Sequence, residues 1–243
     1  MAGTPPFTIF PLGDAAATID LGNCIDEQHN RRALALYDWL HNHRFPGILD
    51  IIMAYSSVSV FFDAALIRAG DEEAGRAVFC RIKDWLAYAW ASVEEEDVPE
   101  ASPPGPLVRI PVCYEPRFAP DMEWVARQTG LSPEEVISIH CATTYRVYMI
   151  GFLPGFPYMG KVDERLVLRR KNQPVHVFAG GVGIAGMQTG IYSLNSPGGW
   201  QIIGRTPVQL FDPWNDPPVR LQTGDRVQFY PVTPAEFEHI GAS

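Results

Sequence analysis

The sequence lacks long apolar runs and clusters of positive charge. No stretch reaches the about 18 apolar residues that a transmembrane helix needs, so we expect no membrane partner. The N-terminal segment has no basic region and contains Asp14 and Asp20, which is unlike a secretory signal and predicts a cytoplasmic protein. The net charge is −9, and the largest basic cluster is 169–171. Because duplex binding needs a basic surface, nucleic acid is not an expected partner.

Cysteine is scarce and scattered, with no CxxC pair among the four residues. We therefore expect buried thiols, and neither a disulfide framework nor a metal site. His41, His43 and Asp50 are the other conceivable metal ligands. We reject them because two residues that are two apart on a helix point in different directions. The four cysteines are Cys24, Cys80, Cys113 and Cys141.

The first part of the chain, residues 1–98, predicts a small α/β sandwich with the order β-β-α-β-β-α. Two β-like runs surround a Gly-Asp turn signal at 13–14, and an amphipathic pattern predicts a helix over 26–43. Two further apolar runs in 48–63 read as a hairpin. A second helix is expected from about residue 71 to residue 92.

An acidic and then Pro/Gly-rich segment, 93–107, is the clearest linker in the chain and predicts a domain boundary. The second domain, residues 108–243, restarts with a strand at 109–114. Helices are predicted over 121–130 and 132–143. The second of them has a capping box, with Ser at 132 and Glu at 135.

Only short strands and turns are predicted from there to residue 232. Many short strands with regular turns favour a closed or nearly closed β barrel. The clearest strand patterns lie at 145–152, 176–181, 201–206, 208–213 and 226–231.

Glycines and aromatic residues gather in residues 151–206, where eleven of the 21 glycines lie. Glycine lets the backbone approach other groups closely, and aromatic rings supply rigid walls. The pattern indicates a shaped cleft on a β scaffold, although the same rings could instead form barrel core. The aromatic residues are Phe152, Phe156, Tyr158, Tyr192 and Trp200.

One glycine pattern, Gly181 to Gly186, matches the GxGxxG signature of dinucleotide-binding folds. That signature requires a helix directly afterwards, whose N-terminus meets the pyrophosphate. Here a β-like segment and a Pro-Gly-Gly turn follow instead. We therefore predict a glycine-rich β turn that lines the cleft.

Several polar residues are candidates for chemistry. His140, near the end of a helix, suits general acid–base work, but it could equally be a helix-end histidine bonded to a carbonyl. Gln188 and Thr189 could offer amide and hydroxyl contacts or ordinary turn hydrogen bonds. Arg170 and Arg205 could hold a carboxylate or phosphate bidentately, or lie in solvent.

Several blocks in one order carry a resemblance to a known family. They are H-x-x-x-x-Y at 140–145, GFLPGFPYMG at 151–160, GGVGIAGMQTGIY at 180–192, SPGGWQIIGRTP at 196–207, and the FDP to GDxVxF region at 211–229. In these blocks the chain resembles the family of 5-oxoprolinase B subunits (PxpB), also described as allophanate hydrolase subunit 1. The sporulation-kinase inhibitor KipI belongs to the same family.

The resemblance implies an α+β chain, with an N-terminal ferredoxin-like α/β domain followed by a C-terminal cyclophilin-like β barrel. It also implies one subunit of an ATP-dependent 5-oxoprolinase that opens 5-oxoproline to glutamate. Such a chain acts with the A and C subunits of that enzyme, is inactive alone, and depends on ATP bound by the assembled complex. The alternatives are a KipI-like inhibitor of a sensor histidine kinase, or a subunit acting on another cyclic amide or a urea derivative such as allophanate.

The resemblance also assigns roles to residues. His140 is the implied proton-transfer group, Arg170 the catalytic anion holder, and the backbone N–H groups of 180–186 further anion contacts. The segment 168–181 departs from the family pattern: it lacks a second arginine and has Phe178 and Gly181 in place of a proline and a serine. The implied substrate-binding residues are Tyr145, Phe156, Tyr158, Gly183, Gln188, Thr189, Tyr192, Trp200 and Arg205.

Overall fold

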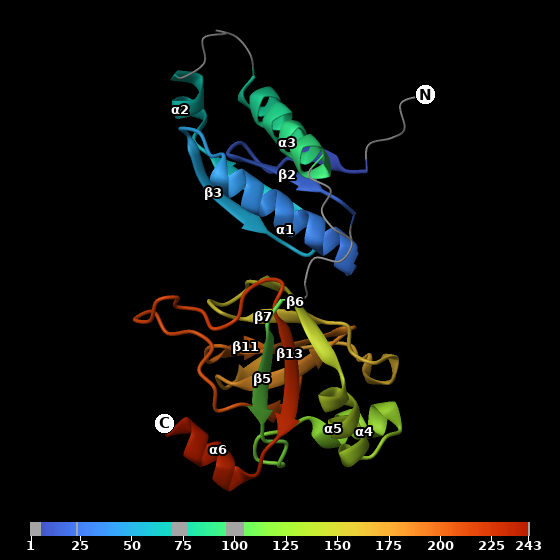
Figure 1. Ribbon diagram of the computed structural model, residues 1–243. Coiled ribbons are helices and arrows are strands. Elements are labelled where there is room, and N and C mark those ends of the chain that lie inside the picture. Colours follow the sequence, from blue (N-terminus) through green and yellow to red (C-terminus); the bar gives the residue numbers. More distant parts are fainter. Residues whose placement is uncertain (1–5, 23, 70–76, 96–104, 243) are drawn as a thin grey trace. The chain divides into compact units, whose positions relative to one another are not determined.

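The computed structural model describes residues 6–22, 24–69, 77–95 and 105–242 (Figure 1). The chain divides into two compact units, residues 1–103 and 104–243, which are described separately below. Most of the predicted linker, residues 96–104, lies outside the described residues. Its first three positions, 93–95, continue the preceding helix.

The first unit is built on a four-stranded antiparallel sheet in the order β1-β2-β4-β3. Both predicted strand pairs are confirmed, and the turn of the first pair contains Gly13 with a φ of 66°. The topology does not decide the ferredoxin-like label, which stays a prediction. The strands are β1 (Thr8–Pro11), β2 (Ala16–Asp20), β3 (Ile48–Met53) and β4 (Ser57–Phe62).

Three helices accompany this sheet: α1 (Glu27–Asn42), α2 (Ala64–Ala69) and α3 (Val78–Glu95). The first predicted helix is confirmed. The predicted start of the second is too early, since α3 begins at Val78, and residues 70–76 lie outside the described residues. Helix α2 has no counterpart among the predictions, because its six residues are too few to show a period. A signal for it exists in Asp63, whose carboxylate accepts from the N–H groups of residues 65 and 66.

The core of this unit lies between the sheet and two helices, α1 and α3. Every second residue of β4 is buried, as expected for a strand with one covered face. The largest fully buried side chains here are aliphatic, which gives a close-packed core. They are Ile19, Leu36, Leu40, Ile67, Ile82 and Leu86. The described buried polar side chains of this unit, Thr18, Asn30 and Ser56, each have a hydrogen-bond partner.

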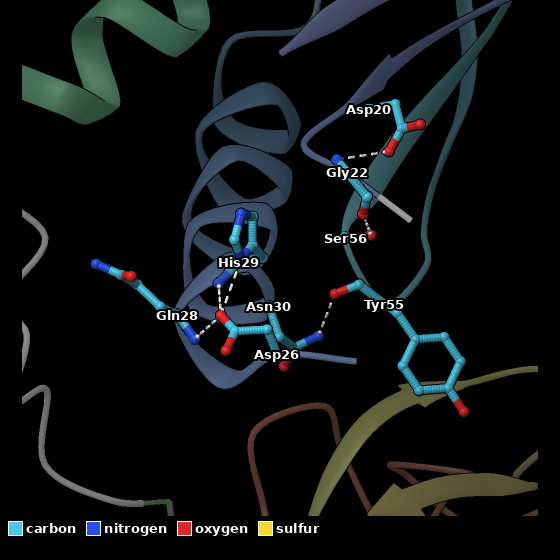
Figure 2. A network of polar contacts seen from close by, with 8 residues as sticks. All are labelled: Asp20, Gly22, Asp26, Gln28, His29, Asn30, Tyr55 and Ser56. Carbon is cyan, nitrogen blue, oxygen red and sulfur yellow. Dashed lines mark hydrogen bonds and ion pairs between the residues drawn. The ribbon is translucent and has the colours of Figure 1, made fainter. Parts of the chain in front are cut away.

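The start of α1 is fixed by a network of polar contacts (Figure 2). The Asp26 carboxylate accepts from the backbone N–H groups of Gln28 and His29, each at 3.0 Å, and from the His29 ring at 2.8 Å. The hydrogen bond from the His29 side chain lowers the pKa of Asp26. Asn30, fully buried in the first turns of the helix, donates to the carbonyl oxygen of Tyr55 at 3.0 Å. The Asn30 side chain therefore ties the start of α1 to the turn between β3 and β4.

The second unit contains a seven-stranded sheet in the order β12-β9-β10-β7-β6-β13-β5. Its two end strands meet where Cys113 and Arg205 exchange backbone hydrogen bonds of 2.8 and 3.0 Å. The sheet is therefore a nearly closed barrel, as predicted; the cyclophilin-like label stays a prediction. The strands are β5 (Leu107–Val112), β6 (Thr144–Ile150), β7 (Pro157–Gly160), β9 (Gly181–Ala185), β10 (Gln188–Ile191), β12 (Gln201–Arg205) and β13 (Arg226–Pro231).

Around the barrel lie a two-stranded ribbon and short helices. Strands β5 and β13 run side by side in parallel, and α4 and α5 lie next to each other (Figure 1). The predicted capping box is confirmed, since the Ser132 hydroxyl accepts from the N–H group of Glu135 at 3.2 Å. The remaining elements are α4 (Met122–Thr129), α5 (Pro133–Ala142), the 3-10 turn η1 (Glu164–Leu166), α6 (Pro234–Gly241), and the ribbon strands β8 (Val175–Val177) and β11 (Ser196–Gly198).

Three predictions about this unit are corrected. Residues 208–213 form no strand, and only a single bridge joins Phe211 to Val219. Pro207 precedes the segment and Pro213 ends it, and neither has an N–H group to donate to a neighbouring strand. The strand predicted at 176–181 is only β8, which ends at Val177. The third correction is an omission: no element is predicted after residue 232, where helix α6 lies, although Thr233 and Glu236 form a second capping box at its start.

The expectation of buried thiols is also only partly right. Among the four cysteines, only Cys113 is fully buried and Cys141 is partly buried, whereas Cys24 and Cys80 are exposed. None of the four forms a disulfide.

We predict that Asp26→Ala lowers the free energy of unfolding by about 1 kcal/mol, because it removes the acceptor for the first turn of α1. Urea denaturation measures the change. Asp26→Asn is the matched control, since asparagine caps helices as well as aspartate does. Equal losses for both variants would contradict the capping role.

Candidate functional site

Strands β9 and β10 give the barrel wall two different faces. Successive side chains of a strand point to opposite faces of a sheet. Val182, Ile184 and Ile191 belong to the barrel core. Gly183 and Gly190 lie between them in sequence and face the opposite side. The outer face of the wall is therefore bare backbone at these positions.

Aromatic rings pack directly on that bare backbone. A Cβ atom at Gly190 would lie 2.9 Å from the Phe156 ring and 3.0 Å from the Trp200 ring. A Cβ atom at Gly183 would lie 3.0 Å from Cβ of Trp200. Real Cβ atoms do not approach other atoms so closely, so the two glycines are what lets the rings reach the sheet. The GxGxxG pattern is thus confirmed as a β segment and not a phosphate-binding turn before a helix.

The rings form a small core on the outside of the barrel. Phe156 contacts Tyr192 and Trp200 edge-on, with ring centroids 5.2 and 5.5 Å apart. These three rings are at most 4% exposed. Only Tyr158, 5.8 Å from the Trp200 ring, is partly exposed. The glycine- and aromatic-rich block therefore forms a packed cluster that reaches solvent only along one edge.

Phe152 lies on that edge in an unusual conformation. Its side chain is 60% exposed, and its ring is 5.5 Å from that of Phe156 and 6.2 Å from that of Tyr192. Its φ is 67°, the only positive value among the described non-glycine residues. Such a backbone costs about 1–3 kcal/mol for a bulky residue, and strain of this kind concentrates at functional sites.

Arg170 lies on the same edge and is held there by its neighbours. Its guanidinium is 5.9 Å from the centroid of the Trp200 ring. The residues on either side are fixed: Lys171 donates its N–H to the Gly199 carbonyl at 2.7 Å, and the Gln201 amide donates to the Arg169 carbonyl at 3.1 Å. The exposed charge of Arg170 is therefore presented on an anchored backbone.

The positive charge of Arg170 affects the pKa values of two tyrosines. Burial raises the pKa values of Tyr158 and Tyr192, and the charge of Arg170 opposes that rise in both. We call Phe152, Tyr158, Tyr192, Trp200 and Arg170 the aromatic corner. At its surface it offers the exposed cation of Arg170, the exposed ring of Phe152 and the partly exposed phenol of Tyr158, while the rings of Tyr192 and Trp200 are buried beneath them. This surface suits a small ligand that has an anionic group and a flat apolar part.

His140 lies elsewhere, inside the barrel. It is fully buried, with Nδ1 2.9 Å from the Tyr114 hydroxyl and Nε2 3.0 Å from the Thr189 hydroxyl. Its ring thus bonds to hydroxyls, so the alternative of a carbonyl-bonded helix end is wrong. The hydroxyl of Tyr145, also buried, donates to the backbone carbonyl of His140 at 3.0 Å.

The hydrogen-bond network assigns the tautomer of this ring. The Thr189 hydroxyl donates to the Gly183 carbonyl at 3.1 Å, so it accepts from Nε2–H of His140. Nδ1 then accepts from the Tyr114 hydroxyl, whose oxygen lies 3.3 Å from the Cys141 thiol. Burial lowers the pKa of His140 to about 3. The histidine is therefore neutral, and it links α5 to the wall strands β9 and β10.

Two other predicted residues lie apart from these groups. Arg205 donates from Nε to the Ala179 carbonyl at 2.8 Å, and its guanidinium lies near the rings of Phe178 and Phe237. Gln188 is partly buried at the start of β10, opposite residues 160 and 185. The structure brings together Phe156, Tyr158, Gly183, Tyr192, Trp200 and Arg170 in one group, and His140, Tyr145 and Thr189 in another.

The backbone N–H groups of 180–186 do not fit a phosphate cradle. Strand β9 is paired on both sides, with β10 and β12. Outside it, Gly180 donates to the Tyr192 carbonyl and Gly186 to the Leu168 carbonyl. These donors are already used in strand pairing and turns.

The described ranges contain no candidate metal site and no candidate membrane span. There, no group of three or more His, Cys, Asp or Glu side chains lies close enough to hold a metal ion. Within the same ranges, no helix combines the length and apolar character that crossing a membrane requires.

Sequence reasoning missed Tyr114 and did not include Phe152 among the substrate-binding residues. A signal for Tyr114 exists, since it continues the inward alternation of Ile110 and Val112 in β5. The left-handed backbone of Phe152 has no sequence signal, because glycine is the residue expected at such a position.

We predict that the burial of His140 makes the protein acid-sensitive. The unfolded chain takes up this proton below about pH 6.5, its ordinary pKa, whereas the folded chain does so only near pH 3. Stability is therefore lost as the pH falls from 6.5 toward 3, by on the order of 1 kcal/mol per pH unit. His140→Gln should flatten this slope in urea denaturation between pH 6.5 and 4.

The exposed His176 offers the matched control, and His176→Gln should keep the pH dependence of the wild type. If His140→Gln does not fold, proton uptake during urea unfolding of the wild type at pH 5 gives the same information. The prediction fails if His140→Gln keeps the full slope.

Comparison with known proteins places the chain among relatives of matching length. The model of a protein family described as "Carboxyltransferase domain, subdomain C and D" matches residues 7–221. The protein named as the B subunit of 5-oxoprolinase in Bacillus subtilis (strain 168) is 39% identical over 235 residues, which cover 96% of each chain.

Two solved structures share the fold but belong to longer chains. The crystal structure of TTHA0988 matches at 35% identity and a TM-score of 0.72, over 90% of this chain and 40% of that one. The Kluyveromyces lactis urea carboxylase matches at 20% identity and a TM-score of 0.75, over 97% of this chain and 22% of that one, which shows the fold alone. The chain belongs to the carboxyltransferase domain, subdomain C and D, family and is a homologue of the 5-oxoprolinase B subunits.

Proposed function

We propose that this chain is the B subunit of a cytoplasmic, ATP-dependent 5-oxoprolinase, which opens 5-oxoproline to glutamate together with the A and C subunits. The observation that carries the proposal is the aromatic corner, where an anchored arginine lies beside exposed and half-exposed rings. The near-full-length similarity to a protein named as the B subunit of a 5-oxoprolinase supports it.

The chemistry of 5-oxoproline matches that corner. The molecule has one carboxylate and one flat five-membered lactam ring. The planar guanidinium of Arg170 can hold the carboxylate through two parallel hydrogen bonds. The rings of Phe152 and Tyr158 can cover the lactam, which fixes its orientation by apolar contact.

Opening a lactam needs activation, because an amide carbonyl is a poor electrophile. ATP, bound by the assembled complex, supplies this activation by phosphorylating the carbonyl oxygen. The strand amides 180–186 of this chain are engaged in pairing and do not hold the phosphates. In the proposal this chain therefore binds and orients the substrate, and its partners supply the nucleotide site.

His140 has a positioning role in this proposal. Its ring is fully buried and does not contact the outer face of the wall directly. It is connected to the wall strands by hydrogen bonds, from its Nε2 to the Thr189 hydroxyl and from that hydroxyl to the Gly183 carbonyl. It holds β9 and β10 in the register that sets Gly183 and Gly190 beneath the aromatic rings. Proton transfer to the substrate would then fall to a group on a partner subunit.

A urea derivative is the second candidate substrate. Allophanate also combines a carboxylate with a flat amide, but it has no ring. The departure of 168–181 from the family pattern favours this candidate. A KipI-like inhibitor of a sensor histidine kinase is the remaining alternative, and it predicts no turnover of either compound.

We predict that the chain mixed with the A and C subunits of its own organism releases glutamate and phosphate from 5-oxoproline and ATP. The chain alone should release neither, because the nucleotide site is incomplete. Coupled assays of glutamate and phosphate measure both products. Release from allophanate instead would favour the second candidate, and no turnover of either compound in a stable complex would contradict the enzymatic role.

We predict that Arg170→Ala raises the KM for 5-oxoproline in that complex about 10- to 100-fold, since it removes a charged hydrogen bond worth about 1.5–3 kcal/mol. Steady-state kinetics measures KM and kcat separately. Arg169→Ala is the matched control, because it removes a neighbouring exposed arginine side chain and keeps the backbone contact to Gln201. Equal effects of the two variants would show that only the overall charge of the segment matters.

A further inference from the structure

The loop between β12 and β13 presents an isolated aromatic side chain. Trp214 is 92% exposed, more than any other large hydrophobic side chain in the described part of the chain. Tryptophan has much to gain from burial, and it is enriched among the residues that dominate protein interfaces. An indole so exposed is therefore a candidate for contact with another protein.

The exposure of Trp214 is built into the loop. Its backbone N–H group donates to one carboxylate oxygen of Asp212 at 3.0 Å, and the Asn215 amide donates to the other at 3.1 Å. At the base of the loop, Asp212 donates its N–H group to the Pro218 carbonyl at 2.8 Å. Four prolines between 207 and 218 further restrict the backbone. The backbone that carries the exposed tryptophan is thus fixed by specific contacts.

A groove of about 670 Å³ adjoins the loop. One side is formed by the loop itself, including Asp212, Asp216 and Arg220, and the other by Ile240 and Gly241 at the end of α6. The groove is open to solvent, and its lining carries the carboxylates of Asp212 and Asp216 and the guanidinium of Arg220. A peptide segment could lie in it beside the loop that carries Trp214.

The same loop also touches the segment that carries the aromatic corner. A Cβ atom at Gly155 would lie 3.0 Å from the Leu210 carbonyl oxygen and 3.0 Å from Cβ of Phe211. Gly155 belongs to the turn that presents Phe152. A protein bound at Trp214 would therefore lie next to the turn that forms one edge of the corner.

We propose that the Trp214 loop and its groove are the docking surface for a lysine- or arginine-bearing segment of the C subunit. The electron-rich face of an indole attracts such cations, and in the groove lining the two carboxylates of Asp212 and Asp216 outnumber the guanidinium of Arg220, on a chain whose net charge is −9. The identity of the partner rests on the proposed function. The two solved structures described above are chains more than twice as long, so this fold does occur joined to further protein mass.

The test is the binding of the purified C subunit to the full-length chain, measured by isothermal titration. Trp214→Ala should raise the Kd at least tenfold, and Asp216→Lys should slow association and weaken its dependence on salt. The difference between the emission spectra of the wild type and Trp214→Phe gives the fluorescence of Trp214. This fluorescence should shift to shorter wavelength when the C subunit is added to the wild type. Tyr88→Ala is the matched control, because Tyr88 is a 65% exposed aromatic residue in the other unit.

Each outcome separates the two proposals. Unchanged affinity of Trp214→Ala for the C subunit would overturn the docking surface and leave the proposed function standing. Absence of any binding by the wild type would overturn both. Self-association that is lost in Trp214→Ala, measured by sedimentation of this chain alone, would overturn the proposed partner and show that a second copy of the chain occupies this surface.

Discussion

Much of the packing in the second unit depends on two glycines of one barrel wall. At Gly183 and Gly190 the outer face of β9 and β10 is bare backbone, and the rings of Phe156 and Trp200 pack against it at distances that no Cβ atom would allow. Those rings anchor Tyr158 and Tyr192, and they provide the surface over which Arg170 lies. The candidate site therefore depends on close packing, since the buried rings support the few side chains that reach solvent.

Inside the same wall, a chain of hydrogen bonds supports that arrangement. The hydroxyl of Thr189 connects the buried ring of His140 to the backbone of Gly183, one strand away. A polar network that is completely satisfied in a dry interior specifies one arrangement of its members, because any shift leaves a group without a partner. The hydrogen-bond network therefore fixes the packing on the inner face of β9 and β10, and the glycines fix the packing on their outer face.

The corner and the Trp214 loop meet at Gly155. Under the proposed function, this contact gives a physical reason why partner protein would be needed. A chain that binds a small substrate at the surface exposes it to water, and partner protein over that surface excludes water and strengthens every electrostatic contact. The strained backbone of Phe152, beside both features, fits a turn whose shape serves binding more than stability.

The sequence alone was sufficient for most elements with a strong period or a cap. Helix α1, the capped helix α5 and strand β13 lie where they are predicted. Their signals are local, because period, capping residues and turn residues act within a few positions. Failures were also local in origin. The segment 208–213 has β-like composition, but Pro207 and Pro213 bound it and cannot donate to a neighbouring strand, and helix α2 is too short to show a period.

What the sequence could not decide was which candidate residues lie together and which face solvent. His140, Arg170 and Arg205 look alike in sequence as polar residues near a glycine-rich block, yet one is buried in the barrel, one lies at the aromatic corner and one lies beside other rings. Their separation depends on which face of β9 and β10 each neighbouring segment covers. That choice is made by contacts between residues far apart in the chain, so only the tertiary structure determines it.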